Sequence, residues 1–478
     1  MSQDPPGTSI VMVPFHGTGA GVCELTWGQA EMWSAIVAQE SSLHLGGLAP
    51  FPVPKELDEI VAGLGWMLGR HQSLRARLRF PPEGGVVQGV ADHGEAPLRV
   101  VDTPDGADPA EVAADVDAEF RQTDFDYERE WPVRLAVIRQ HGIATHLVAV
   151  YCHVALDIAG MGALFRNGLF TLLFTKTDSQ ATPPEVAAPD LLDQVAWQRG
   201  PSGQRHNKAV LRYWKRQLAT VPAARFDLAT EGQRPRYWQA TMRSAAVGLA
   251  LSSITARTST DSSTILLAAA AMTLVEITGR GPAVFQIAVS NRFRPGLSDL
   301  VSAVAQSGLC VVDVEGAGFD EVLERTARGA MKAYLNGYFD RTEMGAMIEE
   351  LSRERGEHIE LTCFFNDRRD PDNRLPVGPR ATPERLAGAR TETAVCWGPH
   401  SDRPFEPLFV HVNDSTPDHV EILLQADTCC FPPDRMRAFL ENFEDTLVTA
   451  AAGLSETLIS GRRSPGSDLQ WTTGRVPR

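Results

Sequence analysis

The spacing of apolar residues along this chain predicts a mixture of helices and strands. Apolar residues recur at helical spacing in residues 25–36, 57–68, 105–122, 160–170, 258–276, 327–335, 343–354 and 433–451. Short apolar runs predict strands at residues 131–138, 147–151, 284–290, 361–366, 408–413 and 420–426. Residues 367–392 are polar and rich in arginine without clear periodicity, so we expect a long loop there.

One of these predicted strands leads into a histidine. The buried run Leu147 to Tyr151 ends just before His153, and a helix is predicted from Gly160 onward. The strand at 131–138 and the turn at His141 form a hairpin with this run, which delivers His153 to a strand end. Asp157 can fold back beneath the imidazole or anchor the turn. A neutral histidine is suited to accepting a proton near neutral pH, although this pattern also fits a hydrogen-bonded core histidine.

Length and composition predict a two-lobed globular protein. The chain has 478 residues, which is too long for a single hydrophobic core, so two lobes are expected. Hydrophobic residues make up 43% of the chain, as in a packed globular protein. A Pro/Ser/Thr-rich stretch at 176–190 marks the expected boundary, giving a flexible lead-in at 1–20, lobes at 21–180 and 181–464, and a tail at 465–478. No apolar run approaches the roughly 20 residues of a membrane span, and no signal-peptide pattern opens the chain, so we expect a cytoplasmic protein that does not bind membranes.

Charge and cysteine content exclude several other classes. The formal net charge of −15 argues against a nucleic-acid-binding protein. The seven cysteines show no Cys-x-x-Cys and no zinc-like spacing, so reduced thiols and no metal site are expected. Phosphate-binding, dinucleotide-binding and Gly-x-Ser-x-Gly motifs are absent.

Several motifs together resemble one family. The stretch from Cys152 to Ile158 resembles the His-His-x-x-x-Asp-Gly motif of condensation domains of nonribosomal peptide synthetases and related acyltransferases, with His153 and Asp157 in place. Cys152 replaces the first His and Ile158 replaces the Gly. The stretches 26–33 and 70–78 are similar to two further motifs of that family, and the resemblance covers roughly residues 20–455.

The resemblance implies a fold and a reaction. The family's fold is of class α/β (α+β), with two chloramphenicol-acetyltransferase-like lobes in a V-shaped pseudo-dimer and a tunnel between them. Such enzymes join an acyl or aminoacyl thioester, held on the phosphopantetheine of a carrier protein or on CoA, to an amine or alcohol acceptor. We therefore expect a free-standing, monomeric enzyme of antibiotic or other secondary metabolism that forms an amide or ester and binds no cofactor of its own.

The resemblance also assigns roles to residues. His153 would be the general base or would position the nucleophile, and Asp157 would pair with Arg292 across the lobes in a structural role. Asn291 departs from the family's Gly before that Arg, and Gln306 stands where Asn is usual. The tunnel candidates are Cys152, Ile158, Gly160, Gln306 and Ser307.

Three of these positions carry specific expectations. Cys152 is adjacent to His153 on a strand, so the two side chains face apart, and Cys152 is expected to be a small buried residue. Ile158 is expected to turn into the apolar interior in an active enzyme, or to obstruct the tunnel in an inactive one. The close-approach role of the missing Gly is expected to move to Gly160. In the stretch 70–78, His71 is expected to be a hydrogen-bonded scaffold residue.

A basic helix is predicted after residue 198, and it runs into the stretch at residues 213–215. It is either a solvated face or a dock for an acidic carrier protein or its phosphate, and the candidate docking residues are Arg205, Lys208, Arg212, Lys215 and Arg216.

Two alternatives to a condensation enzyme remain open at this stage. One is a catalytically degenerate member that recruits a partner enzyme or a carrier protein, which the departures at Cys152, Ile158, Asn291 and Gln306 favour. The other is an epimerisation-type member of the same fold.

Overall fold

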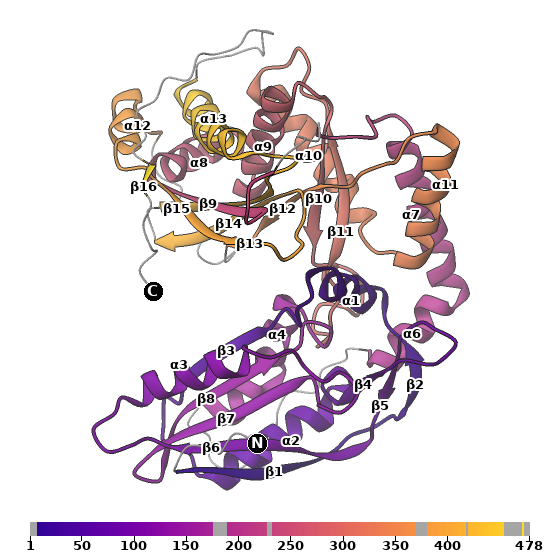
Figure 1. The fold of residues 1–478 in the computed structure, drawn as a ribbon, viewed down its shortest axis with the longest axis vertical. Coiled ribbons are helices and arrows are strands. Elements are labelled where there is room, and N and C mark those ends of the chain that lie inside the picture. The colour runs from indigo at the N-terminus through magenta and orange to yellow at the C-terminus, as the bar shows by residue number, and fades with distance from the viewer. Residues whose placement is uncertain are drawn as a thin grey trace. The chain divides into compact units, whose positions relative to one another are not determined.

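The computed structural model describes residues 7–174, 189–226, 232–369, 380–416, 419–453 and 471–472. The chain divides into two compact units, Met1–Asn207 with Ser290–Gln306, and Lys208–Val289 with Ser307–Arg478 (Figure 1). The boundary expected at 176–190 precedes this division, because the first unit continues to Asn207, and residues 176–188 of the expected boundary lie outside the described residues.

The first unit is built on a mixed sheet. Its described strands pair in the order β1-β6-β7-β8-β3, with β6 and β7 parallel and the other neighbours antiparallel. The strands are β1 (Thr8–His16), β3 (Leu45–Pro50), β6 (His93–Asp102), β7 (Val133–Gln140) and β8 (Ile143–Tyr151).

Alternation along these strands buries both faces of the sheet. Leu135 and Val137 of β7 pack in the core that includes α2 (Leu57–Arg70), whereas Ala136 and Ile138 pack against α3 (Pro109–Phe120). Helices on both faces explain why β7 and β8 are continuous apolar runs. The remaining helices of this unit are α1 (Trp27–Gln39), η1 (Gln72–Arg75), α4 (Ile158–Leu164), η2 (Phe165–Leu169), α5 (Phe170–Phe174) and α6 (Leu191–Arg199).

A second, smaller sheet lies in the same unit. It comprises β2 (Gly21–Glu24), β5 (Val87–Val90) and β4 (Ala76–Arg79), all antiparallel in that order. One face is buried through Gln88, Leu78 and Val90.

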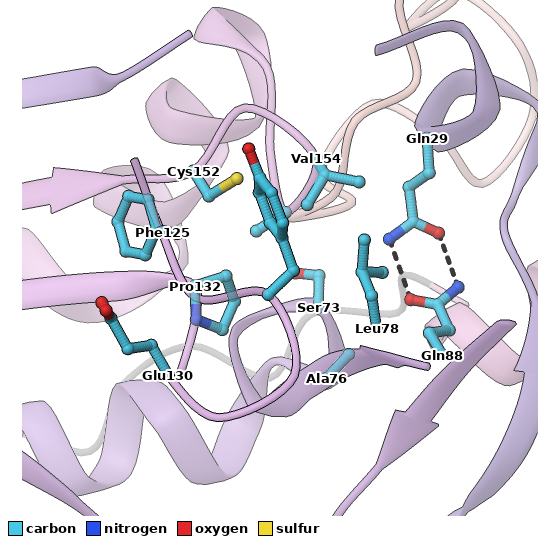
Figure 2. A pocket seen from close by; sticks show the side chains of 12 residues that line it. Gln29, Ser73, Ala76, Leu78, Gln88, Phe125, Glu130, Pro132, Cys152 and Val154 are labelled. Carbon is cyan, nitrogen blue, oxygen red and sulfur yellow. Dashed lines mark hydrogen bonds between the residues drawn. The ribbon is translucent and has the colours of Figure 1, made fainter. Parts of the chain in front are cut away.

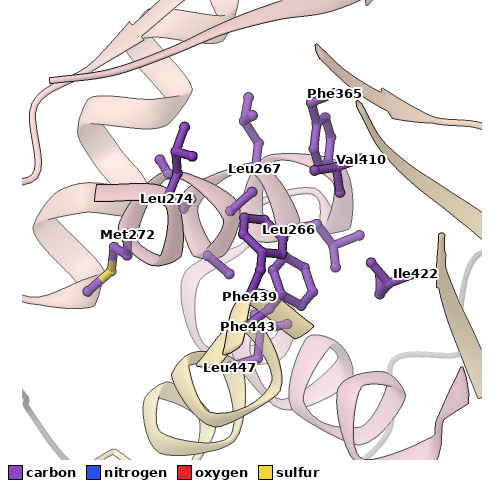
Figure 3. Packing of buried hydrophobic residues seen from close by; sticks show 14 of the residues in the cluster. Leu266, Leu267, Met272, Leu274, Phe365, Val410, Ile422, Phe439, Phe443 and Leu447 are labelled. Atoms are coloured by element: carbon purple, nitrogen blue, oxygen red, sulfur yellow. The ribbon is translucent and has the colours of Figure 1, made fainter. Parts of the chain in front are cut away.

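The second unit contains an eight-stranded sheet among its described residues, in the order β11-β10-β12-β14-β15-β9-β13-β16. One large apolar core joins the sheet to the helices α8 (Ala245–Thr258), α9 (Ser262–Thr278), α10 (Phe319–Leu335) and α13 (Pro433–Ala452). Figure 3 shows Leu266, Phe439 and Ile422 in this packing. The strands are β9 (Tyr237–Ser244), β10 (Ala283–Val289), β11 (Gln306–Val312), β12 (Cys363–Asp367), β13 (Ala394–Ser401), β14 (Leu408–Thr416), β15 (His419–Asp427) and β16 (Trp471–Thr472).

A separate apolar cluster joins α7 (Pro201–Leu218) and α11 (Arg341–Arg355) to residues of β10 and β11, among them Val284 and Leu309. The division between the two units falls inside α7. The second unit also contains α12 (Pro383–Arg390). In the described ranges no single helix is long and apolar enough to cross a bilayer, and only α8 with α9, bent by 110°, passes on combined length and composition.

The sequence predictions need three corrections. The lead-in at 1–20 is not flexible throughout, because β1 pairs along its whole length with β6 and buries Val13 and Phe15. The expected loop at 367–392 contains α12, which Thr382 caps and Pro383 starts, although residues 370–379 lie outside the described residues. The expected tail contributes β16, which pairs with β13, and the rest of it is outside the described residues.

Candidate functional site

The hairpin of β7 and β8 delivers His153 to the end of a strand, as the sequence predicts. Three backbone hydrogen bonds fix the loop after β8: Cys152 N–H donates to Pro132 O at 3.0 Å, His153 N–H to Ser42 O at 3.3 Å, and Ala155 N–H to Cys152 O at 3.0 Å. The imidazole therefore stands on a rigid frame.

His153 is partly exposed, and its Nδ1 is buried without a hydrogen-bond partner among the described residues. Burial lowers the pKa of His153 below the ordinary value, while the Asp157 carboxylate and backbone groups of His153 and Leu156 act in the opposite direction. The imidazole is therefore neutral at pH 7 and able to accept a proton.

Asp157 is the most connected side chain of this loop. One carboxylate oxygen, Oδ1, accepts hydrogen bonds from Gly160 N at 2.6 Å and Arg292 Nη2 at 2.7 Å. The other, Oδ2, accepts from the backbone N–H groups of Val304 and Ala305, both at 2.8 Å. The Asp157 carboxylate thus caps α4 and fixes the backbone at 304–305 to the His153 loop.

The predicted pairing of Asp157 with Arg292 is present, and both side chains are buried, at 5% and 11% exposure. It differs from the expectation in one respect: Ser290–Gln306 belongs to the first unit, so this pair lies within one unit. Arg292 also donates to the carbonyl oxygens of Leu297, Leu300 and Ser302, which holds the segment in a closed loop. Its role is to build the loop that Asp157 anchors.

Asn291 explains how the chain tolerates a departure from the family pattern. Its φ is 57°, a left-handed conformation that favours Gly and that Asn adopts more readily than most other residues. The buried amide donates to Val304 O at 3.1 Å and accepts from Arg294 Nε at 3.1 Å. The substitution keeps the backbone turn that positions Arg292.

Gly160 has the close-approach role that the sequence predicts. A Cβ atom there would lie 2.7 Å from Ser302 O and 3.1 Å from Arg292 Nη2. The approach is to the protein's own backbone, so it serves packing of α4 on the 290–306 segment.

The leading expectation for Ile158 is wrong. Its side chain is 58% exposed and does not enter the apolar interior. Ile158 is the first residue of α4, whose N-cap is Asp157, and the buried positions of this helix are Gly160, Ala163 and Leu164. The cap fixes the orientation of the first turn and leaves position 158 outside.

Cys152 is fully buried with Ile36, Phe125 and Val154. Burial raises the pKa of its thiol to about 12, so the thiol is protonated and cannot act as a nucleophile near pH 7. Figure 2 shows Cys152 in a pocket with Phe125, Val154 and the hydrogen-bonded amides of Gln29 and Gln88. This cavity of about 10 Å³ has space for about one water molecule and not for a substrate.

The last two tunnel candidates stand where β11 begins. Gln306 is buried at 3% exposure, and Ser307 is partly buried. Their expected contact with substrate stays a prediction.

The basic residues predicted to dock a carrier protein are on α7. Lys215 forms ion pairs with Glu354 at 2.9 Å and Glu350 at 3.7 Å, so its charge is already partnered. The others have exposed side chains: Arg205, Lys208, Arg212 and Arg216. Their spacing places them along one side of the helix.

The motif at residues 70–78 has a structural role. Burial lowers the pKa of His71 to about 3, and its ring packs edge-on against Trp66. The Nε2 atom of His71 has no hydrogen-bond partner within the described chain. His71 is therefore a scaffold residue that is held by packing, and not by hydrogen bonds as expected. Arg75 donates to the carbonyl oxygens of Gly69, Gly19, Thr18 and Ala91.

Sequence reasoning missed the backbone donors of the site. Val304 and Ala305 act through their N–H groups, which no side-chain pattern reveals, and Ser42 supports His153 through its carbonyl. The helix signature Thr26-x-x-Gln29 does appear as a capping box. Within the described ranges, no three His, Cys, Asp or Glu side chains gather closely enough to hold a metal ion.

The sequence of this chain is similar to that of a nonribosomal peptide synthetase. Phosphinothricin tripeptide synthetase PhsC of Streptomyces viridochromogenes is 28% identical in an alignment of 346 residues that covers 67% of this chain and 30% of that protein. The chain therefore spans less than a third of the length of this relative.

Solved structures show the same fold at low identity. The condensation domain that mediates chain release from the enacyloxin polyketide synthase matches with a TM-score of 0.67 and 17% identity, covering 98% of this chain and 86% of that chain. The X-domain from teicoplanin biosynthesis matches with a TM-score of 0.66 and 18% identity, covering 93% and 98%. The model of the Condensation domain family matches residues 57–458, most of the chain. The chain belongs to the condensation domain family.

Proposed function

We propose that this protein joins a thioester-bound acyl or aminoacyl group to an amine or alcohol acceptor, with His153 as general base or positioning residue. The observation that carries the proposal is His153 itself. It stands on a rigid strand end, its Nδ1 has no protein partner within the described residues, and its imidazole is neutral at pH 7. Members of the condensation domain family generally form amide bonds, which agrees with this chemistry.

The reaction asks little beyond alignment and proton management. A thioester is already activated, so holding two reactants in line supplies much of the rate. A neutral imidazole that takes the proton of the attacking amine or alcohol contributes typically 10²–10⁴-fold. Asp157 supports this by fixing the loop and does not need to touch the substrate.

Delivery of the acyl group by a carrier protein is part of the proposal. The exposed cations of α7 at positions 205, 208, 212 and 216 would complement an acidic carrier or its phosphopantetheine phosphate. CoA is the alternative acyl donor, and it would present the same kind of phosphate to these cations.

The test is a product screen. Acetyl-, octanoyl- and aminoacyl-pantetheine thioesters are incubated with panels of amines and alcohols, and amide or ester products are measured by mass spectrometry. His153→Ala is expected to abolish the products that the wild type makes. His146→Ala, in the same strand β8, is the matched control and is expected to keep them. Equal product formation by wild type and His153→Ala would contradict the proposal.

A second function is a module that recruits a partner enzyme without catalysis. Cys152 replaces a histidine and is buried and protonated, and Ile158 leaves an apolar side chain exposed beside the His153 loop. The teicoplanin X-domain, a fold relative only, has been solved in complex with OxyB. Absence of any product in the screen, with a stable complex formed through Ile158, would favour this function.

A further inference from the structure

The solvent face of the small sheet has an unusual composition. In β4 and β5, Arg77 lies opposite Gly89 and Arg79 opposite Val87, while in β2 Val22 lies opposite Gly89. Residues directly opposite each other in antiparallel strands share a face. This face therefore carries two arginines about 7 Å apart along β4, with Gly89 on the neighbouring strand β5 opposite Arg77.

A cleft of about 720 Å³ opens on this face. Gly89 lies beneath the Arg79 side chain in this cleft, because a Cβ atom there would lie 2.8 Å from Nε and Nη2 of Arg79. Apolar side chains form its walls, and two of them are exposed: Val22 at 57% and Phe80 at 43%. The volume is within the range of small-molecule sites.

Arg77 is prepared for a ligand that the protein does not supply. Its guanidinium carbon lies 3.5 Å from the centroid of the Trp131 ring, and its Nε is buried without a hydrogen-bond partner in the described chain. Burial lowers the pKa of Arg77, and no carboxylate opposes that effect. Natural proteins rarely leave a partly desolvated guanidinium without an anion.

Trp131 is itself held rigidly. Its Nε1 donates to Glu95 O at 2.8 Å, and Phe15 packs edge-on at 5.1 Å. The ring covers one face of the Arg77 guanidinium, which leaves the guanidinium edge for hydrogen bonding. A fork of this kind binds carboxylate or phosphate oxygens in a bidentate manner.

The carboxylates on this face do not supply the anion that Arg77 lacks. Glu24 is partnered by Arg199, and Glu128 lines the cleft but forms no ion pair with Arg77 or Arg79 among the described residues. His153, Asp157 and Arg292 do not line this cleft.

We propose that this cleft is a binding site for an anionic group, a carboxylate or a phosphate, carried on a short apolar body. Arg77 binds the anion through its guanidinium edge, Arg79 adds a second cation on the same face, and the apolar walls contact the body. The site is independent of the acyl-transfer function proposed above.

The experiment is isothermal titration calorimetry of the full chain with octanoate, octyl phosphate, inorganic phosphate and octanol. Saturable binding of octanoate or octyl phosphate is expected, with octanol at least about tenfold weaker because it lacks the charge. The tighter of the two anions identifies the headgroup, and binding of inorganic phosphate with equal affinity would overturn the role of the apolar body.

Three variants localise the binding. Arg77→Gln and Arg79→Gln are each expected to raise the Kd about tenfold. Gly89→Val is expected to displace the Arg79 guanidinium that lies over Gly89 and to raise the Kd at least as much as Arg79→Gln does. The control, Arg328→Gln on α10, is expected to change nothing, because Arg328 is 64% exposed and distant in sequence from the cleft.

Thermal melting checks that the variants fold. If Arg77→Gln unfolds because it loses its contact with Trp131, Arg79→Gln at an exposed position decides the question. No saturable binding of either anion, or a Kd within twofold of wild type in the folded variants, would overturn the proposal.

Discussion

Asp157→Ala is predicted to destabilise the first unit strongly. The substitution removes four hydrogen-bond acceptor contacts, to Gly160 N, Arg292 Nη2, Val304 N and Ala305 N. It leaves the buried Arg292 charge without its partner, which typically costs 3–5 kcal/mol, and the lost helix cap is part of the same loss. We expect the free energy of unfolding of this unit to fall by about 3–5 kcal/mol.

Asp157→Asn distinguishes charge from shape. An amide has one acceptor oxygen, and if that oxygen serves the N–H groups of Val304 and Ala305, the amide nitrogen faces the donors of Gly160 and Arg292. The N–H groups of the Asn amide would then face the N–H groups of Gly160 and Arg292, and donors that face donors form no hydrogen bond. We therefore expect Asn to recover little of the stability that Ala loses.

The assay is urea denaturation followed by fluorescence, together with hydrogen exchange of the 298–306 backbone. The Val304 and Ala305 amides should exchange faster in Asp157→Ala, because their acceptor is gone. Asp102→Ala is the matched control: its carboxylate is 48% exposed and pairs with Arg139 in a surface ion pair, for which about 1 kcal/mol or less is expected. The reasoning is refuted if Asp157→Ala costs no more than Asp102→Ala.

Three further predictions follow from the same geometry. Gly160→Ala should destabilise by about 1–3 kcal/mol in urea unfolding, because the added methyl meets the Ser302 carbonyl oxygen, and an unchanged midpoint would contradict this. Ile158→Ala should change the free energy of unfolding by about 0.5 kcal/mol or less because the side chain is exposed, and a loss above about 2 kcal/mol would show that it packs inside. Burial lowers the pKa of His71 and of His411 to about 3, so below pH 6.5 the unfolded chain binds protons that the folded chain does not. Stability should therefore fall as pH drops from 6.5, by about 1.4 kcal/mol per pH unit for each histidine, and denaturation at pH 7, 6 and 5 that shows no such slope would refute it.

The sequence predicts the parts of the site that side-chain patterns encode. An apolar hairpin followed by His153 and Asp157 places the histidine at a strand end, and the family motif leads to Arg292 as the partner of Asp157. The position of Gly160 is also readable, because only a residue without a side chain permits this approach to Ser302.

Other parts depend on contacts that the sequence does not display. The direction of Ile158 follows from the Asp157 cap, and Asn291 keeps a left-handed turn that the usual Gly would provide. The polar, Gly- and Pro-rich composition of residues 1–20 predicts a flexible lead-in, yet β1 pairs with β6 there, and its alternate residues Val13 and Phe15 are buried. These outcomes are set by tertiary pairing and not by local composition.

The role of His153 as a base is tested most directly by the pH dependence of product formation. For the thioester and acceptor that the wild type uses, the rate should fall on an acid limb whose midpoint lies below 6.5, because burial lowers the pKa of His153. His153→Ala should lose this limb and be slower by about 10²-fold or more at pH 7. A variant that keeps the wild-type rate and the same acid limb would contradict the account.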